Sequence, residues 1–130
     1  MPQWIRIALG VVIGFVAWFV VATVGNLLLR GLLTGYAQAE PAMTFTLPMQ
    51  LARLVLGAIS SVAAGFACAA SMRSVASAVR YFAAFLVLFF IPVHYSLWTR
   101  FPLWYHVVFL GSLAPLALLG GSLARVGKSR

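Results

Sequence analysis

Four long stretches of this chain contain no Asp, Glu, Lys or Arg, and they limit the possible folds more than any other feature. They cover residues 7–29, 54–72, 81–99 and 101–124, which are 23, 19, 19 and 24 residues long, and an arginine stands at every boundary. At about 1.5 Å per helical residue they reach roughly 28–36 Å, the thickness of a bilayer's hydrocarbon core. Because backbone groups in lipid must bond within their own segment, we interpret each stretch as a membrane-spanning helix.

The composition excludes a soluble globular domain. With 64% hydrophobic and 8% charged residues, the chain has too few polar side chains to cover a soluble surface. Its net charge of +8 would indicate nucleic acid in a soluble protein, but here we assign it to basic residues that meet anionic lipid headgroups, and we expect no nucleic-acid partner. We predict one all-α integral membrane domain over residues 1–130, a four-transmembrane-helix antiparallel bundle with an outer loop at 31–47 and spans at about 7–29, 50–72, 80–98 and 103–124.

The distribution of basic residues predicts the orientation of the bundle. One side holds six of them: Arg6, Arg73, Arg80, Arg125, Lys128 and Arg130. The other side holds three: Arg30, Arg53 and Arg100. Since cytoplasmic segments carry the excess of Lys and Arg, both termini should be cytoplasmic. The high ratio of Arg to Lys and the abundant Ala favour a bacterial origin, so we expect a multi-pass protein of the inner membrane. The first stretch is too long for a signal-peptide core, and we expect it to be retained.

Small residues predict how the helices pack. They recur every four positions in the second span, at Gly57, Ser61, Gly65 and Ala69. The first span offers Gly10 and Gly14, and the last span offers Gly111, Ala114, Ala117 and Gly121. Faces of this kind let helix backbones approach closely in a membrane. We therefore expect the first, second and fourth spans to pack tightly, and the third, which is rich in Phe and Leu, to face lipid or a partner protein. Pro92 and Pro115 should kink the last two spans.

Five polar or ionisable groups are predicted to lie in one layer near the outer loop: Asn26, Glu40, Arg53, His94 and His106. Ionisable groups inside a membrane are costly and usually mark a function, so these residues form a candidate outer-leaflet ligand site. The alternative for Arg53 is an ion pair with Glu40 or contact with headgroups, and for the histidines interfacial hydrogen bonding. We assign Tyr36 to the solvated outer loop, and Tyr105 to the aromatic belt of the outer interface.

No motif predicts catalysis. The chain has no acidic pair, no Gly-rich phosphate loop, and no Ser or Cys nucleophile at a recognisable spacing from a base. Two histidines and one distant glutamate are too few for a zinc site, so we expect no metal and no cofactor, although bis-histidine haem ligation between the last two spans is geometrically conceivable. The lone cysteine, Cys68, lies in the middle of the second span and is interpreted as a packing residue.

The last span has a recognisable pattern. Pro102-Leu103-Trp104-Tyr105-His106, followed by Pro115 and Leu119-Gly120-Gly121, resembles the last helix of small bacterial inner-membrane proteins with four helices and no established activity. The resemblance implies the same topology and brings no activity with it. Small multidrug-resistance transporters also have four helices, but their pattern needs a glutamate in the first helix, and residues 7–29 contain no acid.

These features lead to three functional hypotheses. The first is a non-catalytic accessory or structural subunit that binds another membrane protein, or itself, because the middles of the spans supply few polar groups beyond hydroxyls such as Thr23 and Ser60. The second is a ligand-binding protein whose outer-leaflet pocket accepts a lipid, a quinone or a haem. The third is a small oligomeric transporter or channel.

Overall fold

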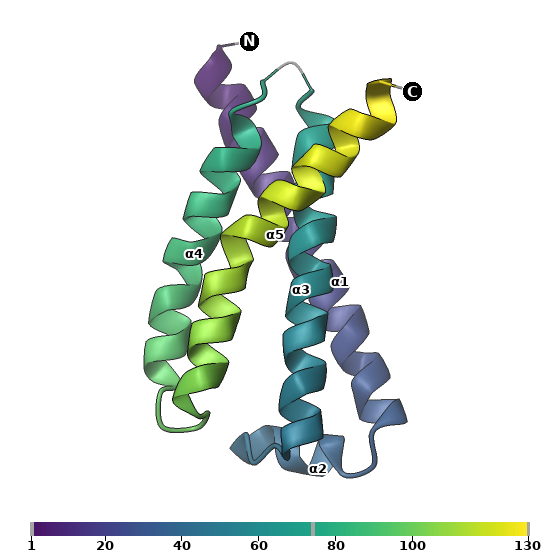
Figure 1. The fold of residues 1–130 in the computed structure, drawn as a ribbon, viewed down its shortest axis with the longest axis vertical. Helices are drawn as coiled ribbons and strands as arrows, with labels where there is room; N and C mark the ends of the chain where they lie inside the picture. Colours follow the sequence, from purple (N-terminus) through teal and green to yellow (C-terminus); the bar gives the residue numbers. More distant parts are fainter. Residues whose placement is uncertain (1, 74, 130) are drawn as a thin grey trace.

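The computed structural model describes residues 2–73 and 75–129, and side chains as far as Val126. Within this part every regular element is a helix, and four long helices dominate (Figure 1). They are α1 (Gln3–Leu32), α3 (Leu47–Ser71), α4 (Ala78–Ser96) and α5 (Leu103–Ser129). Two short elements, α2 (Tyr36–Ala39) and the 3-10 helix η1 (Glu40–Ala42), lie between α1 and α3. The all-α prediction is confirmed.

All four long helices are long and apolar enough to cross a membrane, as predicted. Their ends extend beyond the charge-free windows, because boundary arginines such as Arg6 and Arg30 are themselves helical. The start of α3 follows local chemistry: Thr46 is extended and a proline occupies the first turn, where its missing N–H leaves no hydrogen bond unmade. The expected outer loop contains α2 and η1.

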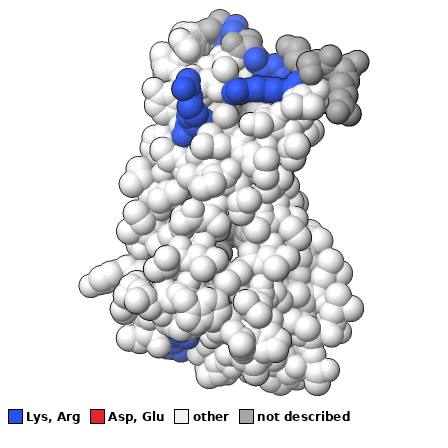
Figure 2. All heavy atoms as spheres, viewed as in Figure 1, with Lys and Arg blue, Asp and Glu red and all other residues white. Residues whose placement is uncertain are grey.

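The bundle has two distinct ends (Figure 1). At the termini end, α1 begins, α5 ends, and α3 connects to α4. At the loop end lie residues 33–46, between α1 and α3, and residues 97–102, between α4 and α5. Figure 2 shows Lys and Arg gathered over one face of the termini end. Here Arg125 donates a hydrogen bond to the carbonyl of Ala76 at 2.8 Å. The side chain of Lys128 and all of Arg130, both counted in the predicted orientation, lie outside the described residues.

The tightest contact of the bundle is between α3 and α5. A Cβ added to Gly65 would overlap with the carbonyl oxygen of Ala117, and one added to Gly120 would overlap with that of Val62. The two backbones therefore touch, as small-residue faces allow. Among the other predicted packing residues, Gly57 lies against the ring of Phe109, Gly121 against Val79, and Gly10 against Cys68 and Ala78. Ser61 and Ala69 are buried.

One packing prediction is wrong, and another holds only in part. Gly111 is exposed with open space around it. It lies four residues before Pro115, at the position whose carbonyl would clash with the proline ring in a straight helix. The third predicted span, α4, does not simply face lipid. Its Phe82 and Leu86 are fully buried, and Phe82 fills the space that Gly14 leaves on α1. Large side chains of α4 thus pack against small residues of α1. Of these two helices, α1 is the one that exposes more apolar surface.

The shape of α5 creates room at the loop end. Pro115 lies near the middle of this helix, which bends about midway in Figure 1. On the termini side of the bend α5 crosses α3, and on the other side it runs beside α4. At the loop end the bundle thus consists of two helix pairs, α1 with α3 and α4 with α5. The candidate site lies between these pairs.

Candidate functional site

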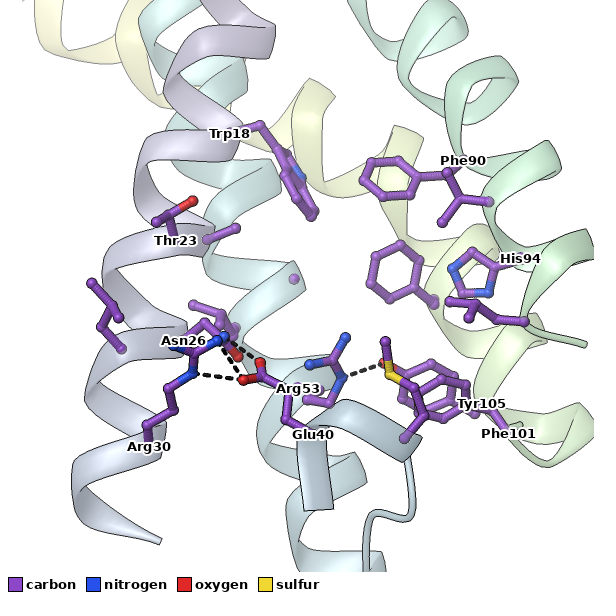
Figure 3. A pocket seen from close by; sticks show the side chains of 18 residues that line it. Trp18, Thr23, Asn26, Arg30, Glu40, Arg53, Phe90, His94, Phe101 and Tyr105 are labelled. Atoms are coloured by element: carbon purple, nitrogen blue, oxygen red, sulfur yellow. Dashed lines mark hydrogen bonds and ion pairs between the residues drawn. The ribbon is translucent and has the colours of Figure 1, made fainter. Parts of the chain in front are cut away.

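A cavity of about 400 Å³ lies between the two helix pairs at the loop end (Figure 3). This volume is in the range of small-molecule sites in proteins. Aromatic side chains form much of its wall: Trp18, Phe90, Phe101, Tyr105 and Phe109. Its polar lining comes from α1, η1, α3 and α4: Thr23, Asn26, Arg30, Glu40, Arg53 and His94. The cavity therefore combines a polar group of residues with an apolar, aromatic wall.

Arg53 is the central polar residue of the cavity. Its Nη1 donates to the hydroxyl of Tyr36 at 2.8 Å, and its Nε donates to the hydroxyl of Tyr105 at 3.3 Å. Its guanidinium carbon lies 4.7 Å from the ring centroid of Phe45 and 5.8 Å from that of Phe101, within cation–π range. No described side chain accepts a hydrogen bond from Nη2. The guanidinium is thus held in place by neutral groups, and one of its donor nitrogens is free for a ligand.

Glu40 does not pair with Arg53, and the prediction of that clamp is wrong. Its carboxylate instead accepts from Nε of Arg30 at 2.6 Å and from Nδ2 of Asn26 at 2.6 Å. The reason is the position of Tyr36, whose hydroxyl donates to Oδ1 of Asn26 at 2.6 Å while it accepts from Arg53. A chain of hydrogen bonds therefore runs from Arg53 to Arg30. Since Arg30 neutralises Glu40, the charge of Arg53 is uncompensated among the described residues.

The two histidines bind each other. His94 and His106 are 4% and 1% exposed, and their Nδ1 atoms lie 2.6 Å apart. Nε2 of His106 lies 3.3 Å from the carbonyl oxygen of Trp98, which only accepts, so this nitrogen carries the proton. In the neutral ring Nδ1 of His106 then accepts from Nδ1–H of His94, and Nε2 of His94 is left as an acceptor. This assignment of tautomers follows from the hydrogen-bond network.

This pairing corrects the sequence-based view of the histidines. Both rings are buried in the bundle, and neither lies exposed at the surface. The two axial histidine nitrogens of a haem lie on opposite sides of the iron, about 4 Å apart across two bonds of about 2 Å, so the 2.6 Å pair leaves no place for a haem iron between them. Among the described residues, no group of three or more His, Cys, Asp or Glu is placed to hold a metal ion.

Four of the five predicted site residues therefore line one cavity, and His106 lies behind His94. The sequence interpretation missed the two tyrosines. Tyr36 is completely buried and Tyr105 is nearly so. Together with Phe45, Met49 and Phe101 they form a second hydrophobic cluster at the loop end. One signal pointed to them: an arginine at this depth, with its charge inside the bundle, needs hydrogen-bond partners at the same level.

The cavity ends at an aromatic layer toward the middle of the bundle. The indole nitrogen of Trp18 donates to Oγ of Ser61 at 3.1 Å, which fixes the ring. The ring centroid of Trp18 lies 4.7 Å from that of Phe90, and Phe109 lies beside both. Beyond this layer the bundle interior is filled by Phe82, Leu86 and Leu113, which are almost fully buried. The polar lining thus stops about halfway along the bundle.

The cavity reaches the surface between α1 and α4. Its lining includes Leu27, which is 56% exposed, together with Val93 on α4 and Leu97 directly after it. Toward the termini end this seam is closed by ring contacts, in which Phe15 and Phe19 of α1 pack against Phe89 of α4. The exposed lining on α1 therefore includes apolar Leu27 together with polar Thr23 and Arg30, whereas the deeper wall carries Arg53 and His94.

Comparisons of the chain with family models, with characterised proteins and with solved structures find no match. The chemistry of the site is given by its own residues. Nη2 of Arg53 and the hydroxyl of Tyr105 supply donors, Nε2 of His94 supplies an acceptor, and aromatic rings exclude water around them. Such a set can orient a small polar headgroup, with an apolar continuation leaving through the opening between α1 and α4.

Proposed function

We propose that this protein is a non-catalytic membrane protein that binds an anionic lipid in the cavity at its loop end. One observation carries the proposal: the Arg53 guanidinium is held by two tyrosine hydroxyls, has no carboxylate partner among the described residues, and faces an aromatic-lined cavity. A charge in such surroundings is costly unless an opposite charge accompanies it. An anionic headgroup would supply that charge.

The chemistry of arginine supports an oxygen anion as the ligand group. A planar guanidinium binds phosphate or carboxylate through directional, charge-assisted hydrogen bonds. Because Glu40 is neutralised by Arg30, the three charged residues of the cavity leave one net positive charge. A neutral quinone would fit the aromatic walls but would leave that charge uncompensated. We therefore favour an acidic lipid over a quinone, and the histidine pair argues against haem.

The opening between α1 and α4 supports a membrane source for the ligand. The cavity lining there includes the apolar side chains of Leu27, Val93 and Leu97, past which a lipid could enter sideways from the bilayer. The cavity would hold the headgroup, while the acyl chains stay among neighbouring lipids. A soluble ligand would have to pass residues 33–46, which pack over the loop end through Tyr36 and Phe45.

We further propose that the protein lies in a bacterial inner membrane with both termini in the cytoplasm. Support comes from the excess of basic residues at the termini end (Figure 2) and from the resemblance of the last helix to small inner-membrane proteins. The cavity would then open in the outer leaflet.

An accessory-subunit role is the second proposal, and it is compatible with lipid binding. An apolar groove of about 880 Å³ runs along α1 and α4 toward the termini end, lined by Trp4, Val11, Phe15, Tyr81, Phe85 and Phe89 among others. A partner helix could occupy it, as could a second copy of the chain. A transporter or channel has less support, because the polar lining ends at the layer of Trp18, Phe90 and Phe109.

The lipid proposal is tested by the lipids that remain bound after mild detergent extraction. Wild-type protein, Arg53→Gln and the control Arg100→Gln are purified in parallel, and bound lipids are measured by mass spectrometry. Arg100 lies at the same end, is exposed, and contacts the carbonyl of Ala42 outside the cavity. We expect a near-stoichiometric acidic lipid in the wild type and control, and a loss of about tenfold or more in Arg53→Gln, since charge-assisted bonds contribute about 1.5–3 kcal/mol. Equal retention by all three proteins would refute the proposal.

A further inference from the structure

We infer that the headgroup bound in this cavity carries a hydroxyl group next to its anionic oxygen, and that His94 recognises this hydroxyl. The inference rests on the proposed lipid site and narrows its ligand class. It starts from the histidine pair, because the binding of an anion by Arg53 alone gives these two residues no role.

The proton positions in the pair make Nε2 of His94 an acceptor. The Trp98 carbonyl fixes the proton of His106 on Nε2, and the 2.6 Å contact then fixes the proton of His94 on Nδ1. The ring of Trp98 stacks on His106 with centroids 4.8 Å apart and an angle of 14° between the planes, which holds His106 in place. His106 therefore positions His94 and does not reach the cavity itself.

Nε2 of His94 has no hydrogen-bond partner in the described structure, although the side chain is more than nine-tenths buried. Within the described residues, every fully buried polar side-chain atom has a partner. Nε2 must therefore retain some accessible surface, and His94 lines the cavity (Figure 3). Nε2 therefore faces the cavity with little accessible surface, so a bound ligand that donates to it would be favoured.

Two kinds of headgroup could donate to this nitrogen, namely a hydroxyl and an ammonium group. The cavity already holds one uncompensated positive charge, at Arg53, and an ammonium beside it would be repelled in these poorly solvated surroundings. A hydroxyl donates without adding charge. The two requirements together describe a phosphodiester that accepts from Arg53 and Tyr105, followed by an alcohol that donates to His94. Phosphatidylglycerol has this arrangement.

A matched pair of lipids separates the hydroxyl from the charge. Phosphatidylglycerol and phosphatidylmethanol with identical acyl chains have the same phosphodiester charge, and only the first has headgroup hydroxyls. We expect wild-type protein in detergent micelles to bind phosphatidylglycerol about fivefold more tightly in a titration followed by native mass spectrometry, the effect of one hydrogen bond. Phosphatidylethanolamine, which donates through an ammonium, should bind more weakly than both.

The variant His94→Phe should remove the preference for the hydroxyl. The ratio of its affinities for phosphatidylglycerol and phosphatidylmethanol should fall from about five to about one. His106→Phe is the second variant, because it frees His94 to adopt either tautomer. It should reduce the preference for phosphatidylglycerol without abolishing it. The wild-type ratio is informative even if either variant fails to fold.

The outcomes distinguish this inference from the proposed function. If both phosphodiesters bind equally well to the wild type but need Arg53, the hydroxyl inference is wrong and the lipid site stands. If phosphatidylethanolamine binds most tightly, an ammonium is the donor and the inference is again wrong. If no lipid depends on Arg53, the proposed function itself fails.

Discussion

The hydroxyl of Tyr36 accepts a 2.8 Å hydrogen bond from Nη1 of Arg53, and this contact connects α2 to α3. The same hydroxyl donates to Asn26 of α1 at 2.6 Å. One side chain from a four-residue helix thus joins three elements and sets the direction of the guanidinium. The site depends on this junction, because without it Arg53 could turn toward the end of the bundle.

Replacing Tyr36 by Phe should test this junction. The substitution leaves Asn26 and Arg53 each short of one partner, and leaving such groups unpaired costs about 1–3 kcal/mol. We expect a lower Tm in detergent and weaker retention of acidic lipid. Tyr95→Phe is the control, because Tyr95 is 83% exposed and should tolerate the change. Equal Tm values for the two variants would show that the Tyr36 hydroxyl does not hold the site together.

Filling the cavity should block the ligand without changing any charge. Ala22 lines the cavity on α1, and Ala22→Phe would place a ring in the space beside Trp18. We expect the bound acidic lipid to fall by about tenfold, comparable to losing the charge-assisted bonds of Arg53. Val24→Phe adds a ring on the exposed face of the same helix and should keep the lipid. Undiminished lipid in Ala22→Phe would place the ligand elsewhere.

The crossing of α3 and α5 should be intolerant of even one methyl group. In Gly65→Ala the new Cβ would overlap with the carbonyl of Ala117, so the helices must separate, and overpacking of this kind typically costs about 1–3 kcal/mol. The measurement is thermal unfolding in detergent. Gly31→Ala is the matched control, because Gly31 is helical and has open space around it. A Gly65→Ala protein as stable as Gly31→Ala would mean that the backbones are not in contact.

The proposed orientation can be tested by cysteine labelling in intact cells. The native Cys68 is fully buried and should stay unlabelled. Gln38 at the loop end and Ala76 at the termini end are both exposed. We expect a membrane-impermeant maleimide to label Gln38→Cys in intact spheroplasts and Ala76→Cys only after lysis. The reverse labelling pattern would mean that the topology is the opposite of the one proposed and that the cavity lies in the inner leaflet.

The sequence predicted the depth of residues better than the direction in which they point. Charge-free windows fix how long each span is, so four helices and the common layer of Asn26, Arg53 and His94 follow from helix length alone. They do not fix the rotation of a helix about its axis. Gly111 was therefore placed at an interface, whereas Gly120, which was not among the predicted packing residues, lies against α3 instead.

The partners of Arg53 were missed for a related reason. Glu40 is the one acidic residue of the chain, which made it the expected partner. The short helix α2 has few residues and no periodicity that would reveal it, so its effect on Tyr36 could not be anticipated. Burial of Tyr36 in the second hydrophobic cluster follows from long-range packing with Phe45 and Phe101. Such contacts depend on how the loop end folds over the bundle.

The most direct test of the lipid site is an experimental structure of the protein in lipid nanodiscs that contain phosphatidylglycerol. The account predicts headgroup density in the cavity, with an oxygen within hydrogen-bond distance of Nη2 of Arg53 and acyl chains leaving between Leu27 and Val93. A cavity closed by side chains, or an Arg53 that contacts only protein groups while the lipid lies elsewhere, would contradict it.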